Sequence, residues 1–222
     1  FVINTLQTTP TQREAVKKLI ERSFGYDPGE DLFVDFAPLF NQYVSPKLTN
    51  YFLEDPSTKS PVGHIGVWKR ELLVEQTSFP ISLIGGVAIS EEFRGKGLFR
   101  HFMQEILQRH ENETAFFLLW SDLSEMYKKL SFYEIGHQIQ IETQQPTQGM
   151  PSSFVQTNWE SLTERKLKRL MSIHEKFFSY HSKVAYLKRT RETWETFRQI
   201  KSSQLHLYSP RGKILGYAIK NK

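Results

Sequence analysis

A short glycine-containing turn carries the residues whose types and spacing point most directly to chemistry. Arg94-Gly95-Lys96-Gly97 follows the apolar run Leu83–Ile89 and precedes a stretch in which apolar residues recur at helical spacing from Leu98. A strand, a glycine turn and a helix start in this order direct free backbone N–H groups and the positive end of the helix dipole at one point. Glycine lets a ligand approach the main chain, and Arg94 and Lys96 add positive charge. The pattern therefore predicts a phosphate-binding cradle.

The elements upstream of this cradle are expected to form a helix and an antiparallel meander. A helix begins at Pro10 with Thr9 as its N-cap and stops before Gly25. The glycines of the second strand, Gly63 and Gly66, indicate a β-bulge. The composition and patterning of the chain predict three strands here, over Leu48–Glu54, Val62–Val74 and Ser82–Ile89.

Downstream of the cradle, the helix from Leu98 leads to a second apolar strand and a second helix. Ala115–Trp120 is wholly apolar and predicts a short buried strand. Asp122 and Glu125 form a capping-box pattern for a helix that continues to Leu130. After this helix, alternating isoleucines predict a final strand; they are Ile135, Ile139 and Ile141.

Two motifs in this order resemble the GNAT superfamily of N-acetyltransferases. Arg94-Gly95-Lys96-Gly97-Leu98-Phe99 resembles motif A, Arg/Gln-x-x-Gly-x-Gly/Ala, and departs from it where Phe99 replaces a small residue. The segment MYKKLSFYEIG resembles motif B, commonly Tyr-x-x-x-Gly-Phe, with Tyr127 and Phe132 in place and Ser131 instead of glycine. The wider phrase GGVAISEEFRGKGLFRHFM is similar to the two-domain enhanced-intracellular-survival branch. The resemblance implies an α/β (α+β) GNAT fold, with a mixed, mostly antiparallel sheet flanked by helices.

The resemblance also implies a ligand, a reaction and roles for particular residues. Acetyl-CoA would bind as co-substrate through the cradle, Arg94 to Phe99, and through the backbone of Val87, Ala88 and Ile89, where an N–H faces the thioester oxygen as an oxyanion-hole donor would. Tyr127, a phenol that is protonated at neutral pH, would act as general acid toward the leaving thiolate. The acceptor would be an amine-bearing small molecule or a protein lysine. The general base stays open among four residues: His64, Glu71, Glu91 and Glu92.

A non-catalytic alternative on the same scaffold remains open at this point. Phe99 and Ser131 depart from the family motifs, and no general base stands out. The alternative is an acyl-CoA-binding or protein-interaction module.

The composition changes after about residue 144, which predicts a linker and a second unit. Pro146, Gly149 and Pro151 mark the linker, and two helices and a hairpin over Leu205–Ile219 follow it. We expect a GNAT domain over residues 1–146 and a partial, truncated second GNAT-like domain over 147–222. A two-stranded ribbon with two helices would be poorly buried alone.

Composition limits the remaining function classes. The chain has no cysteine, which excludes disulfides and a cysteine nucleophile, and no His/Asp/Glu cluster has metal-ligand spacing. No apolar run is long enough to cross a membrane, so we expect a cytoplasmic protein. Residues 1–146 hold 14 Lys/Arg and 19 Asp/Glu, whereas residues 147–222 hold 15 and 5. The basic second part lacks a nucleic-acid motif, so we do not expect nucleic-acid binding; the oligomeric state, which could be a homo-oligomer, is left open.

Overall fold

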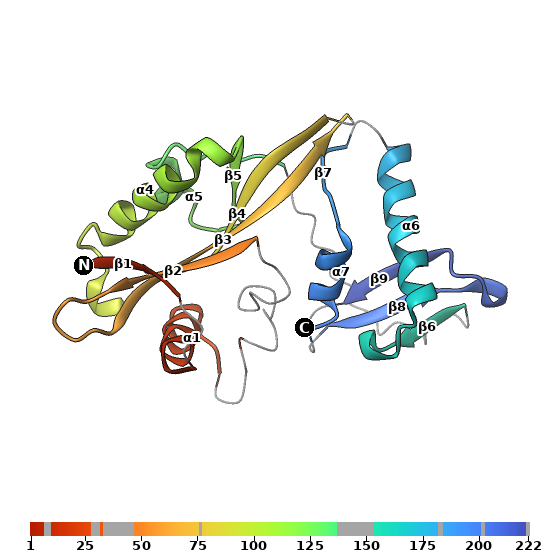
Figure 1. Cartoon of the computed structure of the whole chain (residues 1–222), viewed down its shortest axis with the longest axis horizontal. Coiled ribbons are helices and arrows are strands. Elements are labelled where there is room, and N and C mark those ends of the chain that lie inside the picture. Colours follow the sequence, from red (N-terminus) through yellow and green to blue (C-terminus); the bar gives the residue numbers. More distant parts are fainter. Residues whose placement is uncertain are drawn as a thin grey trace.

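The computed structural model places two β-sheets, one in each part of the chain (Figure 1). It describes residues 1–6, 10–27, 32, 47–75, 77–136, 153–181, 184–200 and 203–220. The boundary expected near residue 146 and the linker up to residue 152 lie outside the described residues, as does Thr9, the expected N-cap of the first helix.

The first sheet is mixed and mostly antiparallel. Its strand order is β1 (Val2–Thr5), β2 (Leu48–Glu54), β3 (Pro61–Val74), β4 (Thr77–Ile89) and β5 (Phe116–Leu118). Only the β4–β5 pairing is parallel. A two-residue strand from the second part of the chain, β7 (Tyr186–Leu187), pairs with the end of β3 at Leu72 and Leu73. The mixed sheet confirms the fold class that the sequence predicted, and the pairing of β7 ties the second part of the chain to the first.

Helices cover both faces of this sheet (Figure 1). On one face α1 (Pro10–Phe24) buries Val16, Leu19 and Ile20 in a cluster that includes Phe52 and Ala88. On the other face α4 (Leu98–His110) and α5 (Ser124–Lys128) supply buried residues to the main core; they are Phe102, Met103, Ile106 and Tyr127. The spacing of these α4 residues is the helical spacing seen in the sequence, so the helix buries one face and exposes the other.

The second sheet has three strands, ordered β6 (Phe154–Thr157), β8 (Gln204–Tyr208) and β9 (Gly216–Lys220). The hairpin of β8 and β9 is confirmed, but the expectation of an isolated two-stranded ribbon is wrong, because β6 adds a third strand beside β8. Two helices accompany it, α6 (Glu164–Tyr180) and α7 (Arg191–Phe197), each N-capped by a threonine side chain, Thr163 or Thr190.

A separate hydrophobic core holds this second sheet together. Leu167 and Leu170 of α6, Trp194 of α7 and Leu205 of β8 are fully buried in it. Phe177, in the last turn of α6, lies outside this core and is 57% exposed. Three strands and two helices therefore bury a core of their own.

Two expectations about the end of the first part are corrected. Asp122 and Glu125 do not form a capping box: α5 has Leu123 as its N-cap residue and no side-chain cap, and Ser121 Oγ accepts the Leu123 N–H instead. Ile135 is 75% exposed and lies outside any strand, while Ile139 and Ile141 lie outside the described residues.

Short 3-10 turns complete the described elements. They cover Glu91–Phe93, Glu111–Glu113, Trp159–Ser161 and Pro210–Gly212. None of the helices in the described part of the chain combines the length and apolar character needed to span a bilayer.

Candidate functional site

The predicted cradle is an open turn that leads directly into α4. Gly95 and Gly97 have φ of +73° and +77°, a left-handed conformation that favours glycine, and Gly97 is the N-cap residue of α4. The N–H groups in the first turn of any helix have no intrahelical partner, and here no side chain caps them either. Apart from the adjacent residues, no atom of the described residues lies within 4 Å of a Cβ built on either glycine. The main chain is therefore accessible to an anion at the positive end of the helix dipole.

Three basic side chains surround this turn. Arg94 donates from Nε to the backbone oxygen of Ile89 at 3.1 Å, which ties the end of β4 to the turn. The Lys96 ammonium lies 5.1 Å from the centroid of the Phe93 ring. Arg100, in the first turn of α4, is exposed. The turn therefore combines uncapped N–H groups with positive charge, as the sequence predicted.

Strand β4 separates from its neighbour before it reaches the turn. It pairs with β5 only at Ile81, Ser82 and Leu83, and the pairing ends there. The residues predicted to contact the ligand through their backbone, Val87 to Ile89, lie beyond that point and face no strand on the β5 side among the described residues. In the part of the chain that the structure describes, this edge of β4 therefore pairs with no other strand.

A β-bulge interrupts β4 in this separated segment. Ala88 pairs with His64 and Gly85 with Gly66, so that Gly86 and Val87 together oppose the single residue Ile65. Gly86 has a φ of +60°. Ala88 is buried on the α1 face, while Val87 and Ile89 pack against the core on the α4 face. A second register shift lies beside Gly63, between Leu53 and Glu54 of β2.

His64 is buried at this bulge. Its Nδ1 lies 2.6 Å from the Gly86 oxygen and its Nε2 lies 3.1 Å from Oδ1 of Asn50. Burial lowers the pKa of His64 to about 4. A fully buried, neutral ring with both nitrogens occupied is unsuited to take a proton from a substrate, which removes His64 from the candidate bases.

Tyr127 lies in the same core as the bulge residues. It is 7% exposed and makes edge contacts with the rings of Phe99, at 5.6 Å, and Phe132, at 5.8 Å. Burial raises the pKa of the Tyr127 phenol, and a hydrogen bond with the Ser121 hydroxyl opposes that rise. The phenol is therefore protonated at neutral pH. Phe99, which departs from motif A, packs against this tyrosine.

Ser131 adopts the backbone conformation that motif B assigns to glycine. Its φ is +63°, and it follows the last turn of α5, where Phe132 N donates to Tyr127 O at 3.2 Å and Ser131 N donates to Lys128 O at 3.1 Å. This is the left-handed cap that ends many helices. The cap places Phe132 against Tyr127, so the serine keeps the function of the turn.

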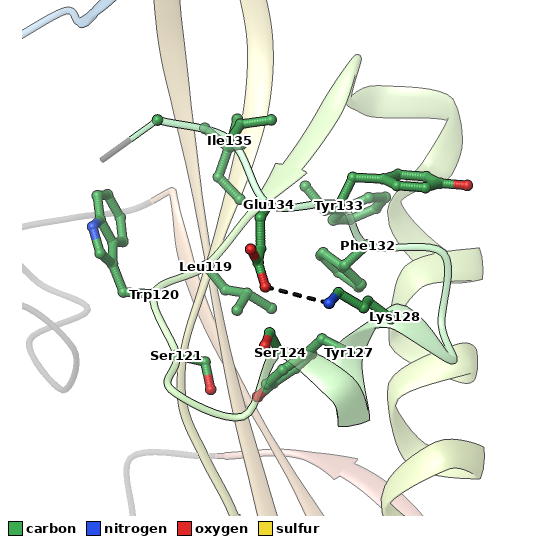
Figure 2. Close-up of a pocket in the computed structure, with 13 residues that line it drawn as sticks. Leu119, Trp120, Ser121, Ser124, Tyr127, Lys128, Phe132, Tyr133, Glu134 and Ile135 are labelled. Atoms are coloured by element: carbon green, nitrogen blue, oxygen red, sulfur yellow. Dashed lines mark ion pairs between the residues drawn. The ribbon is translucent and has the colours of Figure 1, made fainter. Parts of the chain in front are cut away.

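A pocket of about 610 Å³ lies beside Tyr127. Its walls come from β5, the loop after it, α5 and residues 132–136. Figure 2 shows the Tyr127 hydroxyl directed toward Ser121 at the edge of this pocket, and the ion pair of Lys128 with Glu134, 3.5 Å apart, on another side. The pocket is large enough for a small-molecule group.

The three glutamates proposed as alternatives for the general base differ in position. Glu71 lies opposite Pro80 near the β3–β4 turn, about 30 Å along β4 from Ile89. The hydrogen bond from Lys188 lowers the pKa of Glu71. Glu91 and Glu92 are exposed in the 3-10 turn just before the cradle, and the pKa of Glu92 is lowered first by a backbone hydrogen bond. Glu71 is therefore too far from the end of β4 to serve as the general base there. The geometry does not distinguish Glu91 from Glu92 as the base.

Three features of the site were missed from the sequence. Asn50, Ser121 and Gly86 each contact a residue of the site, yet the sequence assigned a role to none of them. Adjacent glycines at 85 and 86 within a strand are a signal for a bulge that could have been used. For Asn50 the sequence offers no such signal, because its contact with His64 joins two strands. Ser121 lies in the loop just before α5, so its contact with Tyr127 is local, but no motif covers that loop.

Comparison with solved structures supports the fold. A GCN5-related N-acetyltransferase from Kribbella flavida superposes with a TM-score of 0.60 at 14% identity, over 100% of this chain and 55% of that one. The Saccharomyces cerevisiae N-myristoyltransferase with bound myristoyl-CoA gives a TM-score of 0.64 at 13% identity, over 98% of this chain and 59% of that one. A predicted acetyltransferase from Clostridium acetobutylicum, solved with acetyl-CoA, gives 0.51 at 13% identity, over 64% of this chain and 96% of that one.

At these low sequence identities, the superpositions show a shared fold alone. The chain spans somewhat more than half the length of the Kribbella and yeast proteins. No curated protein sequence matches significantly. A family model described as an acetyltransferase (GNAT) domain matches residues 6–136, which include the cradle, the bulge and Tyr127. The chain therefore belongs to the GNAT acetyltransferase family.

Proposed function

We propose that this chain is an acetyl-CoA-dependent N-acetyltransferase that passes an acetyl group directly to a primary amine. The observation that supports it most strongly is the combination of an uncapped glycine turn with a strand that leaves its neighbour just before that turn. The turn would hold an anion, and the separated strand end would offer backbone groups to the rest of the ligand. A ligand with a pyrophosphate and an extended arm would use both.

The residues of the cradle fit such a ligand. The open surface at Gly95 and Gly97 admits a phosphate close to the N–H groups of Leu98 and Phe99. Lys96 and Arg100 would neutralise its charge. Arg94, which donates to Ile89, would hold the turn in register with β4. We assign the pyrophosphate to this turn.

The separated end of β4 would bind the arm that carries the thioester. Val87, Ala88 and Ile89 would supply backbone donors and acceptors along their unpaired edge, and one N–H at the bulge would face the acyl oxygen. Acetyl-CoA would supply the activated acyl group. A carbon–nitrogen bond would form to the amine while the carbon–sulfur bond breaks, and the proton that the nitrogen loses would pass to solvent, from which the Tyr127 phenolate is reprotonated.

Tyr127 would donate its phenolic proton to the leaving thiolate. Its raised pKa keeps it protonated at neutral pH, and its hydroxyl faces the edge of the pocket. The hydrogen bond with Ser121 would hold the hydroxyl, and the rings of Phe99 and Phe132 would hold the phenol.

We further propose that the second sheet is part of a second GNAT-like domain, as in the two-domain enhanced-intracellular-survival branch. Its own core and its strand contact through β7 support a unit that packs against the first. Residues 1–146 and 147–222 would then be the two domains.

The test is a titration of acetyl-CoA into the purified chain, followed by an amine panel. We expect binding in the micromolar range and release of free CoA with at least one amine, with kinetics that require both substrates together. Acetyl-CoA binding without turnover across small amines and lysine peptides would favour an acyl-CoA-binding module. No binding to a folded sample would reject the proposal.

A further inference from the structure

His64 lies between two strands and a bulge, and its two ring nitrogens have different partners. It is 0% exposed and stands on the face of the sheet that α1 covers, with Phe52 and Ala88 as its cross-strand neighbours. Nδ1 meets the carbonyl oxygen of Gly86, and Nε2 meets the side chain of Asn50. The imidazole therefore links β2 to the bulge of β4.

The partner of Nδ1 determines the tautomer of this ring. A backbone carbonyl only accepts hydrogen bonds, so Nδ1 must carry the proton in the 2.6 Å contact with Gly86. The ring is neutral at neutral pH, since burial lowers its pKa to about 4. Nε2 is then an acceptor, and the Asn50 amide, which can be turned over without changing its shape, would present its NH₂ group to it.

The contact with Gly86 also sets the direction of the next backbone N–H. The Gly86 carbonyl and the Val87 N–H belong to one planar peptide, and the described residues contain no cis peptide. In a trans peptide the two groups point in opposite directions. With the Gly86 oxygen held toward His64, the Val87 N–H points away from His64, on the segment of β4 that has left β5.

We propose that His64 is a positioning residue: through the Gly86 carbonyl it aims the Val87 N–H at the acyl oxygen of the thioester. This inference rests on the proposed function. Gly86 has left the regular ladder and has a positive φ, so its peptide plane is not fixed by strand pairing. The hydrogen bond from His64 Nδ1 to the Gly86 oxygen fixes the orientation of this peptide in place of the missing hydrogen bond between strands. Donors fixed before the reaction give the largest benefit to acyl transfer.

Two substitutions separate the contacts of the two ring nitrogens. His64→Asn keeps an amide N–H near the place of Nδ1, whereas His64→Gln places its amide near Nε2 and loses the bond to Gly86. We expect His64→Gln to lower kcat roughly 10- to 100-fold with a KM for acetyl-CoA within about twofold. His64→Asn should keep kcat within about threefold of the parent. Both variants should lose similar thermal stability. An unchanged kcat in His64→Gln, or equal losses in both variants, would overturn the inference.

A spectroscopic measurement tests the same geometry without turnover. In ¹⁵N-imidazole NMR of the parent chain, His64 should show a protonated Nδ1 and an unprotonated Nε2 at pH 7. The backbone amide of Val87 should shift in His64→Gln and stay near its parent position in His64→Asn. A protonated Nε2, or a Val87 amide chemical shift that changes in neither variant, would reject the positioning role even if acetyl transfer is demonstrated. A parent chain with this NMR signature but no acetyl transfer would instead reject the proposed function.

Discussion

Two buried histidines, His64 on β3 of the first sheet and His174 on helix α6 beside the second sheet, have different surroundings. In both, burial lowers the histidine pKa to about 4. His64 of the first sheet has partners at both nitrogens, at the point where β4 bulges and leaves β5. His174 of the second part bonds to the Tyr217 hydroxyl through Nδ1, and its buried Nε2 has no hydrogen-bond partner among the described residues.

The strands around these histidines differ in the same way. The second sheet pairs residue for residue along β6, β8 and β9, without a register shift. The first sheet carries two register shifts, a positive-φ glycine within a strand and an unpaired strand end, all at the end of β4 that leads to the cradle. The irregular backbone of the first sheet lies where the proposed ligand would bind, whereas the described strands of the second sheet pair regularly throughout.

The largest expected effect comes from a carboxylate in the cradle. Gly97→Glu should lower acetyl-CoA affinity by more than roughly 100-fold, because it places negative charge and bulk at the anion site. Gly212→Glu is the matched control, since Gly212 also has a positive φ of 76° and open space around its Cβ. Calorimetry should show binding lost only in the first variant. Equal binding by both would show that the turn does not hold the ligand.

Removal of the proposed general acid, the Tyr127 hydroxyl, should lower the catalytic rate by nearly the same factor. Tyr127→Phe should lower kcat about 100-fold and leave acetyl-CoA affinity within a few-fold, because the phenol serves the leaving group. Tyr217→Phe removes a partly buried hydroxyl that bonds to His174 and Arg189 in the second part. It should lower thermal stability and leave kcat unchanged. A Tyr127→Phe enzyme with parental kcat at every pH would remove Tyr127 from the mechanism.

A glycine-to-alanine substitution should lower stability more in the first sheet, at Gly63, than in the second sheet, at Gly216. A Cβ on Gly63 would lie 2.8 Å from Ile89 Cδ1 and 3.2 Å from Leu53 Cβ. Gly63→Ala should destabilise by about 1–3 kcal/mol, as overpacked cores do. On Gly216 the nearest atom, Tyr208 Cβ, is 3.7 Å away, so Gly216→Ala should change stability by less than about 0.5 kcal/mol. Urea denaturation compares the two, and similar values would mean that the bulge region adapts freely.

Acid should weaken both sheets through their histidines. Each has a folded-state pKa of about 4 against a reference value of 6.5, so below pH 6.5 the unfolded chain binds protons that the folded chain does not. Stability should therefore fall as pH falls from about 6.5 to 4, by about 1–2 kcal/mol per histidine between pH 7 and 5. Denaturation at both pH values tests this. His64→Asn and His174→Asn should each remove part of the dependence, and a slope unaffected by both together would contradict it.

The smallest effects come from two non-glycine residues in the left-handed conformation. Ser131 has a φ of +63° and Arg211 a φ of +54°. Ser131→Gly and Arg211→Gly should each stabilise by up to about 1 kcal/mol, because glycine has no Cβ to strain this conformation. Thermal denaturation measures both. If Ser131→Gly leaves stability unchanged while Arg211→Gly raises it, then the left-handed conformation at the end of α5 carries no strain at Ser131.

Much of the first part of the chain could be predicted, because its signals are local. The boundaries of β2, the start of α1 at Pro10 and the start of α4 at Leu98 follow from turn residues and apolar periodicity. The capping box at Asp122 and Glu125 failed, because Leu123 took the cap position and the chain used Ser121 instead. Strand β6 was missed, since four mostly exposed residues carry no strand signal until β8 lies beside them.

The sequence by itself determined the cradle. Two glycines between an apolar strand and an amphipathic helix fix an open turn at the helix start, whatever the rest of the chain does. The tertiary structure alone decided the geometry of β4: where it leaves β5, which peptide is bulged, and that His64, itself held by Asn50, bonds to that peptide. Those features depend on contacts between residues 14 to 35 positions apart, and such contacts form only when the strands have found their partners.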